Sequence, residues 1–226
     1  MLSGTASALP ADALQCLQVI TPSWTSKKGT LQRFERASGA LPWVPVGPAI
    51  PVVVGENGLA WGLGLHPATP GPSKREGDGR APAGVFMLTA VFGLSRQDAG
   101  WRPGGLPFIP LEDALVCVDD PKSAHYARIV REGEVPRDWK SAERMKISAY
   151  RVGVVVAHNA QGRAGAGSCI FLHLWAGPNS DTSGCTAMSP ASMRLIAGWL
   201  RADARPLLVQ MPQASYSRVR AAWDLP

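Results

Sequence analysis

The chain has 226 residues, of which 46% are hydrophobic and 18% are charged, a composition typical of a folded globular domain and not of a disordered chain. Its formal net charge is +6, but the basic residues are scattered, with no arginine-rich helix, zinc-finger spacing or aromatic RNA-binding signature. We therefore expect a mixed solvated surface with no nucleic-acid partner, and no membrane span, because no apolar run reaches the roughly 18 residues that a spanning helix needs.

The first 15 residues differ in character from the rest of the chain. Residues 1–10 contain no Lys or Arg and only a short, weakly apolar stretch, which makes a poor signal peptide. Gln15 precedes Cys16 where a lipoprotein cleavage site would carry a small residue, so lipidation is not expected. We predict a flexible or processed segment over residues 1–15 and a single domain over residues 16–226, with a C-terminal tail from about residue 212.

Short β-like segments separated by turn residues recur through the first half of the chain. Asn57-Gly58 is the strongest short marker of a hairpin. Strands at this spacing are typical of a sandwich or a barrel. The segments that we predict as strands are residues 16–20, 30–34, 50–54, 85–92 and 115–118.

Two segments between these strands are predicted to be irregular. Residues 66–84 form a long loop rich in Gly, Pro and charge, and loops of that length inside a compact domain are usually functional. Within it, Asp78 and Arg80 have two interpretations: a substrate-lining pair, or a structural ion pair that fixes the loop, which we favour. Residues 119–146 carry many charges and are expected to form an irregular excursion over one face.

The C-terminal half carries the strongest signals for regular structure. Residues 151–157 and 168–175 are predicted strands, and residues 207–211 form a final one. A helix is expected over residues 190–202, because Ser189 suits the N-cap and Pro190 suits the first turn.

Cys185 is the candidate nucleophile. It follows Gly184, which lets backbone N–H groups approach a substrate carbonyl, and it precedes a helix whose N-terminal dipole would lower the thiol pKa. His173, at the end of a strand, is the candidate base, and Thr182 and Ser183 add hydroxyls nearby. On spacing alone, a small buried cysteine and a structural histidine are the commoner interpretation.

The remaining cysteines and histidines do not indicate a metal centre. The four cysteines are widely spaced, and they are compatible with one or two disulfides whose pairing stays open. Without a His-Glu-x-x-His pattern, we expect neither a metal nor a cofactor. Because side chains alternate between the two faces of a strand, one interpretation is that His158 reaches the site cleft. His66 and His125 are expected at the surface.

Several blocks in the same order resemble the L,D-transpeptidase (YkuD-type) catalytic domain family. The similarity covers residues 17–211 and is closest to a branch with G-S-x-I-F-L-H and T-x-G-C motifs. The blocks that carry the resemblance are Ser168-Cys169-Ile170-Phe171-Leu172-His173, Thr182-Ser183-Gly184-Cys185-Thr186-Ala187-Met188, Gly55-Glu56-Asn57-Gly58-Leu59-Ala60-Trp61-Gly62 and the segment from Lys74 to Phe86.

The resemblance implies a mainly β fold, with a sandwich-like or barrel-like mixed sheet and one or two short helices, one of them after Cys185. It also implies Cys185 as nucleophile, His173 as general base, and an oxyanion hole that involves Gly184 and the Cys185 N–H. Asn159 matches a position near the active site, with a turn residue as the alternative. The candidate substrate-binding residues are Ser183, Thr182, Asn159, His158, Thr186 and Arg80.

The motif also departs from the better-known branch of the family. Ser183 stands where that branch has a second histidine, and Thr186, Ala187 and Met188 replace the arginine or asparagine that usually follows the cysteine. The group that orients His173 and the acceptor specificity are therefore left open.

The expected function is peptidoglycan L,D-transpeptidation of stem peptides through a thioester, by a monomer in the periplasm or cell envelope. Three alternatives stay open: an L,D-carboxypeptidase or endopeptidase with water as acceptor, a non-catalytic cell-wall-binding module, and an effector secreted into a rival cell.

Overall fold

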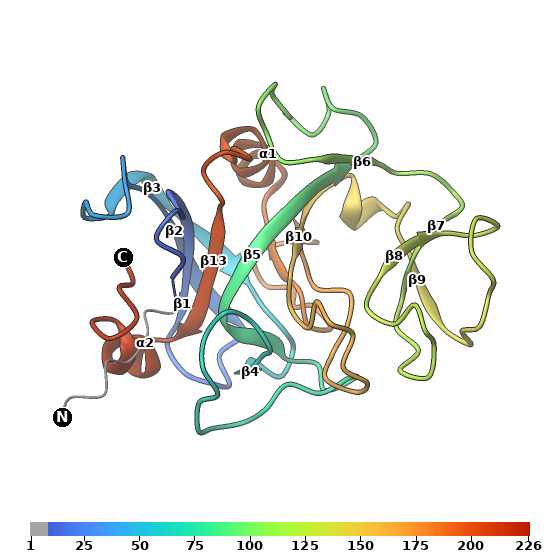
Figure 1. The fold of residues 1–226 in the computed structure, drawn as a ribbon, viewed down its shortest axis with the longest axis horizontal. Helices are drawn as coiled ribbons and strands as arrows, with labels where there is room; N and C mark the ends of the chain where they lie inside the picture. Colours follow the sequence, from blue (N-terminus) through green and yellow to red (C-terminus); the bar gives the residue numbers. More distant parts are fainter. Residues whose placement is uncertain (1–8) are drawn as a thin grey trace.

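The computed structural model describes residues 9–226 and shows a mainly β protein (Figure 1), as expected. None of the helices in these residues is long and apolar enough to cross a membrane. The elements are β1 (Gln15–Thr21), β2 (Lys28–Glu35), β3 (Val44–Val53), β4 (Leu59–Trp61), β5 (Ala81–Gly93), β6 (Phe108–Pro110), β7 (Leu115–Val118), β8 (Ile129–Arg131), β9 (Ala142–Arg144), the 3-10 turn η1 (Ser148–Tyr150), β10 (Val152–Val156), β11 (Phe171–Leu174), β12 (Thr186–Met188), α1 (Pro190–Trp199), β13 (Leu207–Pro212) and α2 (Gln213–Val219).

Most of the strands belong to one sheet that closes on itself. Its order is β10-β11-β12-β3-β2-β1-β13-β5, and a further pairing of β5 with β10 completes the ring. β4 and β6 add to β5 outside this ring. Closure leaves these strands with few exposed backbone edges, which is the usual advantage of a barrel over an open sheet.

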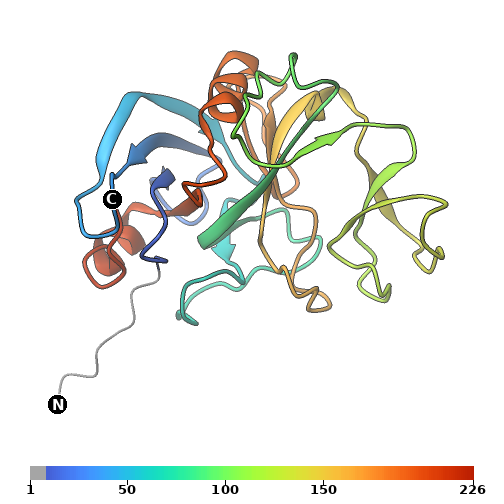
Figure 2. The ribbon, with the colours of Figure 1, turned by 45° about the horizontal axis from the view of Figure 1, so that its top comes forward.

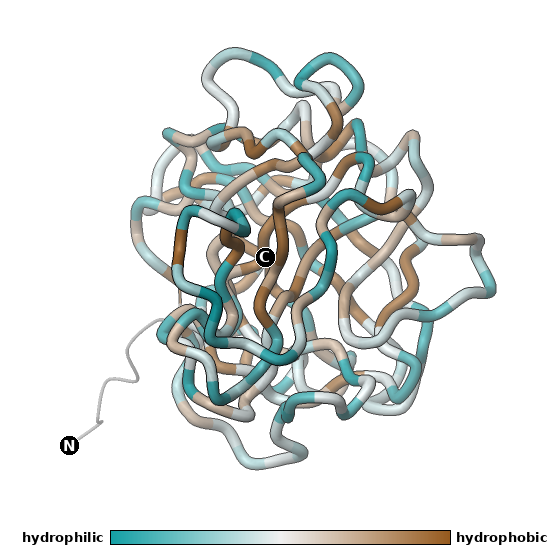
Figure 3. The backbone as a smooth tube through the Cα atoms, turned by 90° about the vertical axis from the view of Figure 1, so that its right-hand side faces the viewer, coloured by the Kyte–Doolittle hydropathy of each residue, from teal (hydrophilic) through white to brown (hydrophobic). Residues whose placement is uncertain are grey.

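The interior of the ring is filled by alternate side chains of its strands. Val152, Val154 and Val156 belong to one continuous core, together with Leu172 from β11. Each fully buried aliphatic side chain of this kind contributes about 1.5–3 kcal/mol. Hydrophilic stretches are frequent in the peripheral loops (Figure 3).

Helix α1 lies across one end of the ring, at the top of Figures 1 and 2. The Ser189 side chain accepts a hydrogen bond from the Ser192 N–H, which confirms the predicted N-cap. Met193 and Ile196 are buried in the barrel core. The helix ends three residues earlier than predicted, because Leu200 adopts an extended conformation.

A second, three-stranded sheet projects from the barrel, on the right of Figure 1. This side sheet has the order β8-β7-β9, so residues 119–146 are more regular than predicted. A disulfide between Cys117 in β7 and Cys169, just before β11, ties it to the barrel. Between the two bodies lies a small core that includes Phe92, Tyr150 and Phe171.

Both ends of the described chain pack more closely than expected. Leu9 and Ala13 are buried, and the Arg36 guanidinium donates to the carbonyls of Pro10 and Ala13 at 3.3 and 2.8 Å. Residues 9–14 therefore belong to the domain, whereas residues 1–8 of the predicted flexible segment lie outside the described part. The C-terminal tail includes α2, which packs on β13 and β1.

Candidate active site

The candidate nucleophile and base lie on adjacent parallel strands of the barrel wall. Leu172 of β11 is in register with Thr186 of β12, so Cys185, one residue before β12, lies beside Phe171. The Phe171 N–H donates to the Cys185 Sγ at 3.3 Å. Phe171 and Cys185 belong to the small core facing the side sheet, and His173 follows Phe171 by two residues on the same face.

The turn before the cysteine is held by two hydrogen bonds. The Thr182 hydroxyl donates to the Cys185 carbonyl at 2.6 Å and accepts from the Gly184 N–H at 3.2 Å. Gly184 has φ +152°, and a Cβ there would lie 3.1 Å from the Arg80 carbonyl oxygen. Gly184 thus allows a backbone conformation that other residues rarely adopt. Its N–H already donates to Thr182, whereas we expected Gly184 to take part in the oxyanion hole.

A cavity of about 530 Å³ opens in front of these residues. Its lining brings together five of the predicted site residues: Cys185, His173, Thr182, Ser183 and Gly184. The rest of the lining combines apolar residues with five charged ones: Lys74, Glu76, Asp119, Glu143 and Asp181.

Cys185 is a protonated thiol in this environment. Burial raises its pKa to about 12, and the nearby Glu143 carboxylate adds to the increase, whereas the Phe171 N–H, Lys74 and Tyr150 oppose it. The expectation that the α1 dipole lowers the pKa of the Cys185 thiol is therefore wrong. β12 separates the thiol from the helix by about 13 Å of extended chain, and a helix terminus acts mainly within its first turn.

His173 is oriented by a backbone carbonyl. Its Nδ1 lies 2.8 Å from the Leu174 carbonyl oxygen, which assigns the proton to Nδ1 and leaves the Nε2 lone pair available. Burial lowers the pKa of His173, so the ring is neutral at pH 7. This bond supplies the orienting group that the sequence left open, although within residues 9–226 His173 has no direct hydrogen bond to Cys185.

Arg80 lies outside the cavity lining. Its guanidinium donates to the Leu59 carbonyl at 3.0 Å. Asp78 is paired with Lys74 at 2.5 Å, and Arg80 contributes only its backbone N–H to Asp78, at 2.9 Å. The prediction of an Asp78–Arg80 ion pair is therefore wrong. Asp78 forms its ion pair with Lys74, and the Arg80 side chain donates to a backbone carbonyl of β4 instead.

Three other predicted binding residues also lie outside the cavity lining, where each has a local structural partner. Both ring nitrogens of His158 are engaged, with the Leu63 N–H at 3.2 Å and the Ala166 carbonyl at 2.9 Å. Asn159, with φ +51°, braces residues 159–167 as a turn residue. The Thr186 hydroxyl donates to Gln210 at 2.7 Å in the barrel.

His66 is buried, so its predicted surface position is wrong. Its ring stacks on Trp223 with centroids 5.5 Å apart and also contacts Trp61 and Phe86. Within residues 9–226, no group of three or more His, Cys, Asp or Glu side chains is placed to hold a metal ion.

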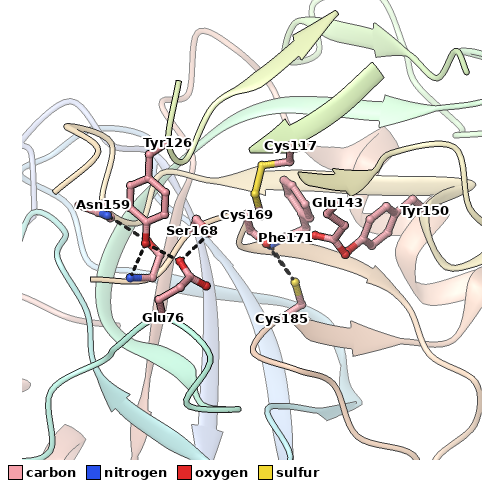
Figure 4. The surroundings of a disulfide bond; sticks show 11 residues. Glu76, Cys117, Tyr126, Glu143, Tyr150, Asn159, Ser168, Cys169, Phe171 and Cys185 are labelled. Atoms are coloured by element: carbon pink, nitrogen blue, oxygen red, sulfur yellow. Dashed lines mark hydrogen bonds between the residues drawn. A yellow bond between two sulfur atoms is a disulfide. The ribbon is translucent and has the colours of Figure 1, made fainter. Parts of the chain in front are cut away.

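Several residues in and beside the cavity wall were not among the predicted site residues, and they come from the side sheet, from η1 and from the loops that contain Glu76 and Ser168. The Tyr150 hydroxyl donates to Glu143, and the hydroxyls of Tyr126 and Ser168 donate to Glu76 (Figure 4). Cys169, next to Ser168, carries the disulfide, and its carbonyl lies 3.5 Å from the Cys185 Sγ. Tyr126 and Glu143 lie in residues 119–146, and the charge density of that stretch was the sequence signal for this part of the wall.

Comparisons with protein-family models, curated proteins and solved structures found no match to the chain. The case for a function therefore depends on the site itself.

Proposed function

We propose that the protein is a cysteine acyltransferase that acts on peptidoglycan stem peptides as an L,D-transpeptidase. The observation that carries the proposal is the convergence of Cys185 and an oriented, neutral His173 on one cavity. A volume of about 530 Å³ suits a short peptide segment, since ligand sites commonly measure about 300–1,000 Å³.

In the first half-reaction, the Cys185 sulfur attacks the carbonyl that joins an L-centre to a terminal D-residue. His173 Nε2 accepts the thiol proton and returns it to the departing amine, while the new C–S bond forms a thioester. The backbone N–H of Cys185 is the donor assigned to the developing oxyanion. Substrate binding would bring Nε2 of His173 and the Cys185 thiol together, because catalytic hydrogen bonds are often long in the absence of substrate.

In the second half-reaction, an acceptor amine attacks the thioester and gives up a proton through His173 to the departing sulfur. The acidic lining, which includes Glu76, Asp119 and Asp181, favours a cationic acceptor group over an anionic one. Water as the acceptor would make the same site a carboxypeptidase.

A cell-envelope location is part of the proposal. The Cys117–Cys169 disulfide supports it, because disulfides persist in oxidising compartments such as the periplasm.

The decisive experiment is incubation of the full chain with purified muropeptides, followed by mass analysis. A cross-linked dimer or an exchanged terminal D-amino acid is expected, and Cys185→Ala should abolish it. Cys16→Ala is the matched control, because Cys16 is the other free cysteine and is fully buried in the barrel. Loss of a D-residue alone would replace transfer by hydrolysis, and no product from the wild type would overturn the proposal.

A further inference from the structure

Tyr150 stands at the junction of the side sheet and the barrel. It ends η1, and its ring makes edge-on contacts with Phe92, Phe171 and His173 at centroid distances of 5.7, 5.4 and 5.2 Å. A ring packed on three sides has little rotational freedom. Its hydroxyl is therefore held at one place in the cavity wall, beside the Cys185 that shares the same small core.

The hydroxyl faces two acceptors but has only one proton. It donates to the Glu143 carboxylate, and it lines the same cavity as Cys185, in the same small core. A phenol can give its hydrogen to one of them at a time. While Glu143 is ionised, it holds that hydrogen, and its charge also opposes a second negative charge on Cys185.

We propose that Tyr150 is a positioning residue that stabilises the Cys185 thiolate, and that Glu143 restrains it by holding the Tyr150 hydrogen. The proposal rests on the assignment of Cys185 as the nucleophile. Once Glu143 is neutralised, the Tyr150 O–H turns to the sulfur. The S–H bond breaks, its hydrogen passes to His173 Nε2, the electron pair stays on sulfur, and Tyr150 keeps its own hydrogen.

The charged and titratable groups around this trio come from several elements. Cys185 is faced by His173 on β11, by Lys74 from the loop before β5 and by Glu143 on β9. Burial raises the pKa of the Glu143 carboxyl, the Tyr150 hydrogen bond opposes this, and the nearby Asp119 and Glu76 add to the increase, so that the pKa is raised overall. Neutral Glu143 is thus more accessible here than for an ordinary glutamate.

The test measures the rate at which iodoacetamide alkylates Cys185 in the native full chain, by mass analysis between pH 6 and pH 9. Tyr150→Phe keeps the ring and loses the hydroxyl. Because ionised Glu143 holds the Tyr150 hydrogen in the wild type, this variant should change the alkylation rate at pH 7 by less than about threefold on its own. Glu143→Gln should speed alkylation about tenfold, because the charge is removed and a neutral amide oxygen holds the Tyr150 hydrogen less strongly than a carboxylate. Tyr216→Phe is the matched control, since Tyr216 bonds the Pro226 carbonyl in the C-terminal tail.

The double variant separates the two ways in which Glu143 can act. If Glu143 acts through Tyr150, the acceleration by Glu143→Gln shrinks to less than about threefold in the Tyr150→Phe background. An equal acceleration by Glu143→Gln in both backgrounds would overturn the proposal.

A second comparison does not need Tyr150→Phe to fold. Glutamine still accepts a hydrogen bond from Tyr150, whereas leucine cannot, so Glu143→Leu should react faster than Glu143→Gln. Equal rates would assign the effect to charge alone and overturn the role of Tyr150. These alkylation rates do not depend on the muropeptide, so inactivity toward muropeptides would refute the proposed function without touching this inference.

Discussion

At the scale of single residues, His158 shows how burial converts a candidate ligand into a structural group. One ring nitrogen accepts from the Leu63 N–H and the other donates to the Ala166 carbonyl. A second ring proton would break the first bond and place a charge in the core. Burial accordingly lowers the pKa of His158 from 6.5 to about 4.

This lowered pKa makes stability depend on pH. Between pH 6.5 and about 4 the unfolded chain binds a proton at His158 that the folded chain does not, so the free energy of unfolding falls as the pH falls through this window. The loss due to His158 should reach about 3 kcal/mol below pH 4. His158→Gln, which retains one donor and one acceptor, should flatten this slope in urea titrations at successive pH values.

A matched control is His125→Gln, which changes a half-buried loop histidine and should leave the slope as in the wild type. His158→Gln with the full wild-type slope would show that His158 does not carry this acid sensitivity. The lowered pKa values of His66 and His173 act in the same direction and leave a residual slope in both variants.

The residues of the candidate site differ in how far sequence could locate them. Cys185 and His173 follow local signals, a Gly-containing turn and a strong β-segment, and the structure places both in one cavity. Glu143 belongs to the charged stretch of residues 119–146, and Tyr150 follows it in an uncharged segment that showed no clear periodicity. Their contact with Cys185 depends on how the side sheet docks on the barrel, which no local pattern encodes.

At the scale of elements, the side sheet depends on its attachment to the barrel. Its three strands are short, and small sheets of this kind are rarely stable alone. The Cys117–Cys169 disulfide closes a loop across 52 residues and joins β7 to the segment just before β11, the strand that carries His173. Glu143 and Tyr150 lie in one wall of the cavity, and the disulfide therefore attaches this wall covalently to the barrel.

Replacing both Cys117 and Cys169 with alanine should destabilise the protein by about 4 kcal/mol, because the unfolded chain regains the entropy of an open 52-residue loop. Urea unfolding of the wild type and the double variant measures this difference. Dithiothreitol should lower the stability of the wild type toward that of the variant and leave the variant unchanged. Equal stability of the two proteins without reductant would show that non-covalent packing alone secures the side sheet.

The limits of the strands were harder to predict than their existence. β11 begins at Phe171, three residues later than the β-like pattern, because Gly167 and Cys169 have φ values of +97° and +54° that no strand accommodates. β7 matches its predicted limits, since a short apolar run ends just before Asp119 and begins just after Asp113 and Ala114. Hydropathy locates a strand, but backbone conformation decides where it ends.

At the scale of the whole molecule, β5 is the strand on which closure depends. Its first half pairs with β13 and its second half with β10. Sequence periodicity favoured a sandwich or barrel. It could not identify the pairings of β5 with β13 and β10, because the paired residues lie about 60–120 positions apart along the chain. We call the β5–β10–β11 part of the ring the seam. The seam also places β10 between β5 and β11, where neighbouring strands crowd its backbone.

Gly153 occupies the tightest point of this seam. A Cβ there would lie 2.2 Å from the Phe92 ring and 2.6 Å from the Leu172 carbonyl oxygen, so contacts on both neighbouring strands would have to move. Gly153→Ala should therefore destabilise the protein by about 3 kcal/mol through overpacking. Urea unfolding monitored by circular dichroism measures this loss.

Gly177→Ala provides the matched comparison, because a Cβ at Gly177 would meet nothing within 4 Å. The added methyl group is the same, but it enters open space, so the change in stability should stay below about 1 kcal/mol. If the two variants were equally stable, the β5–β10–β11 seam would have room to relax. The closed ring would then tolerate a displaced β10, and tight packing at Gly153 would not be what holds β10 between its two neighbours.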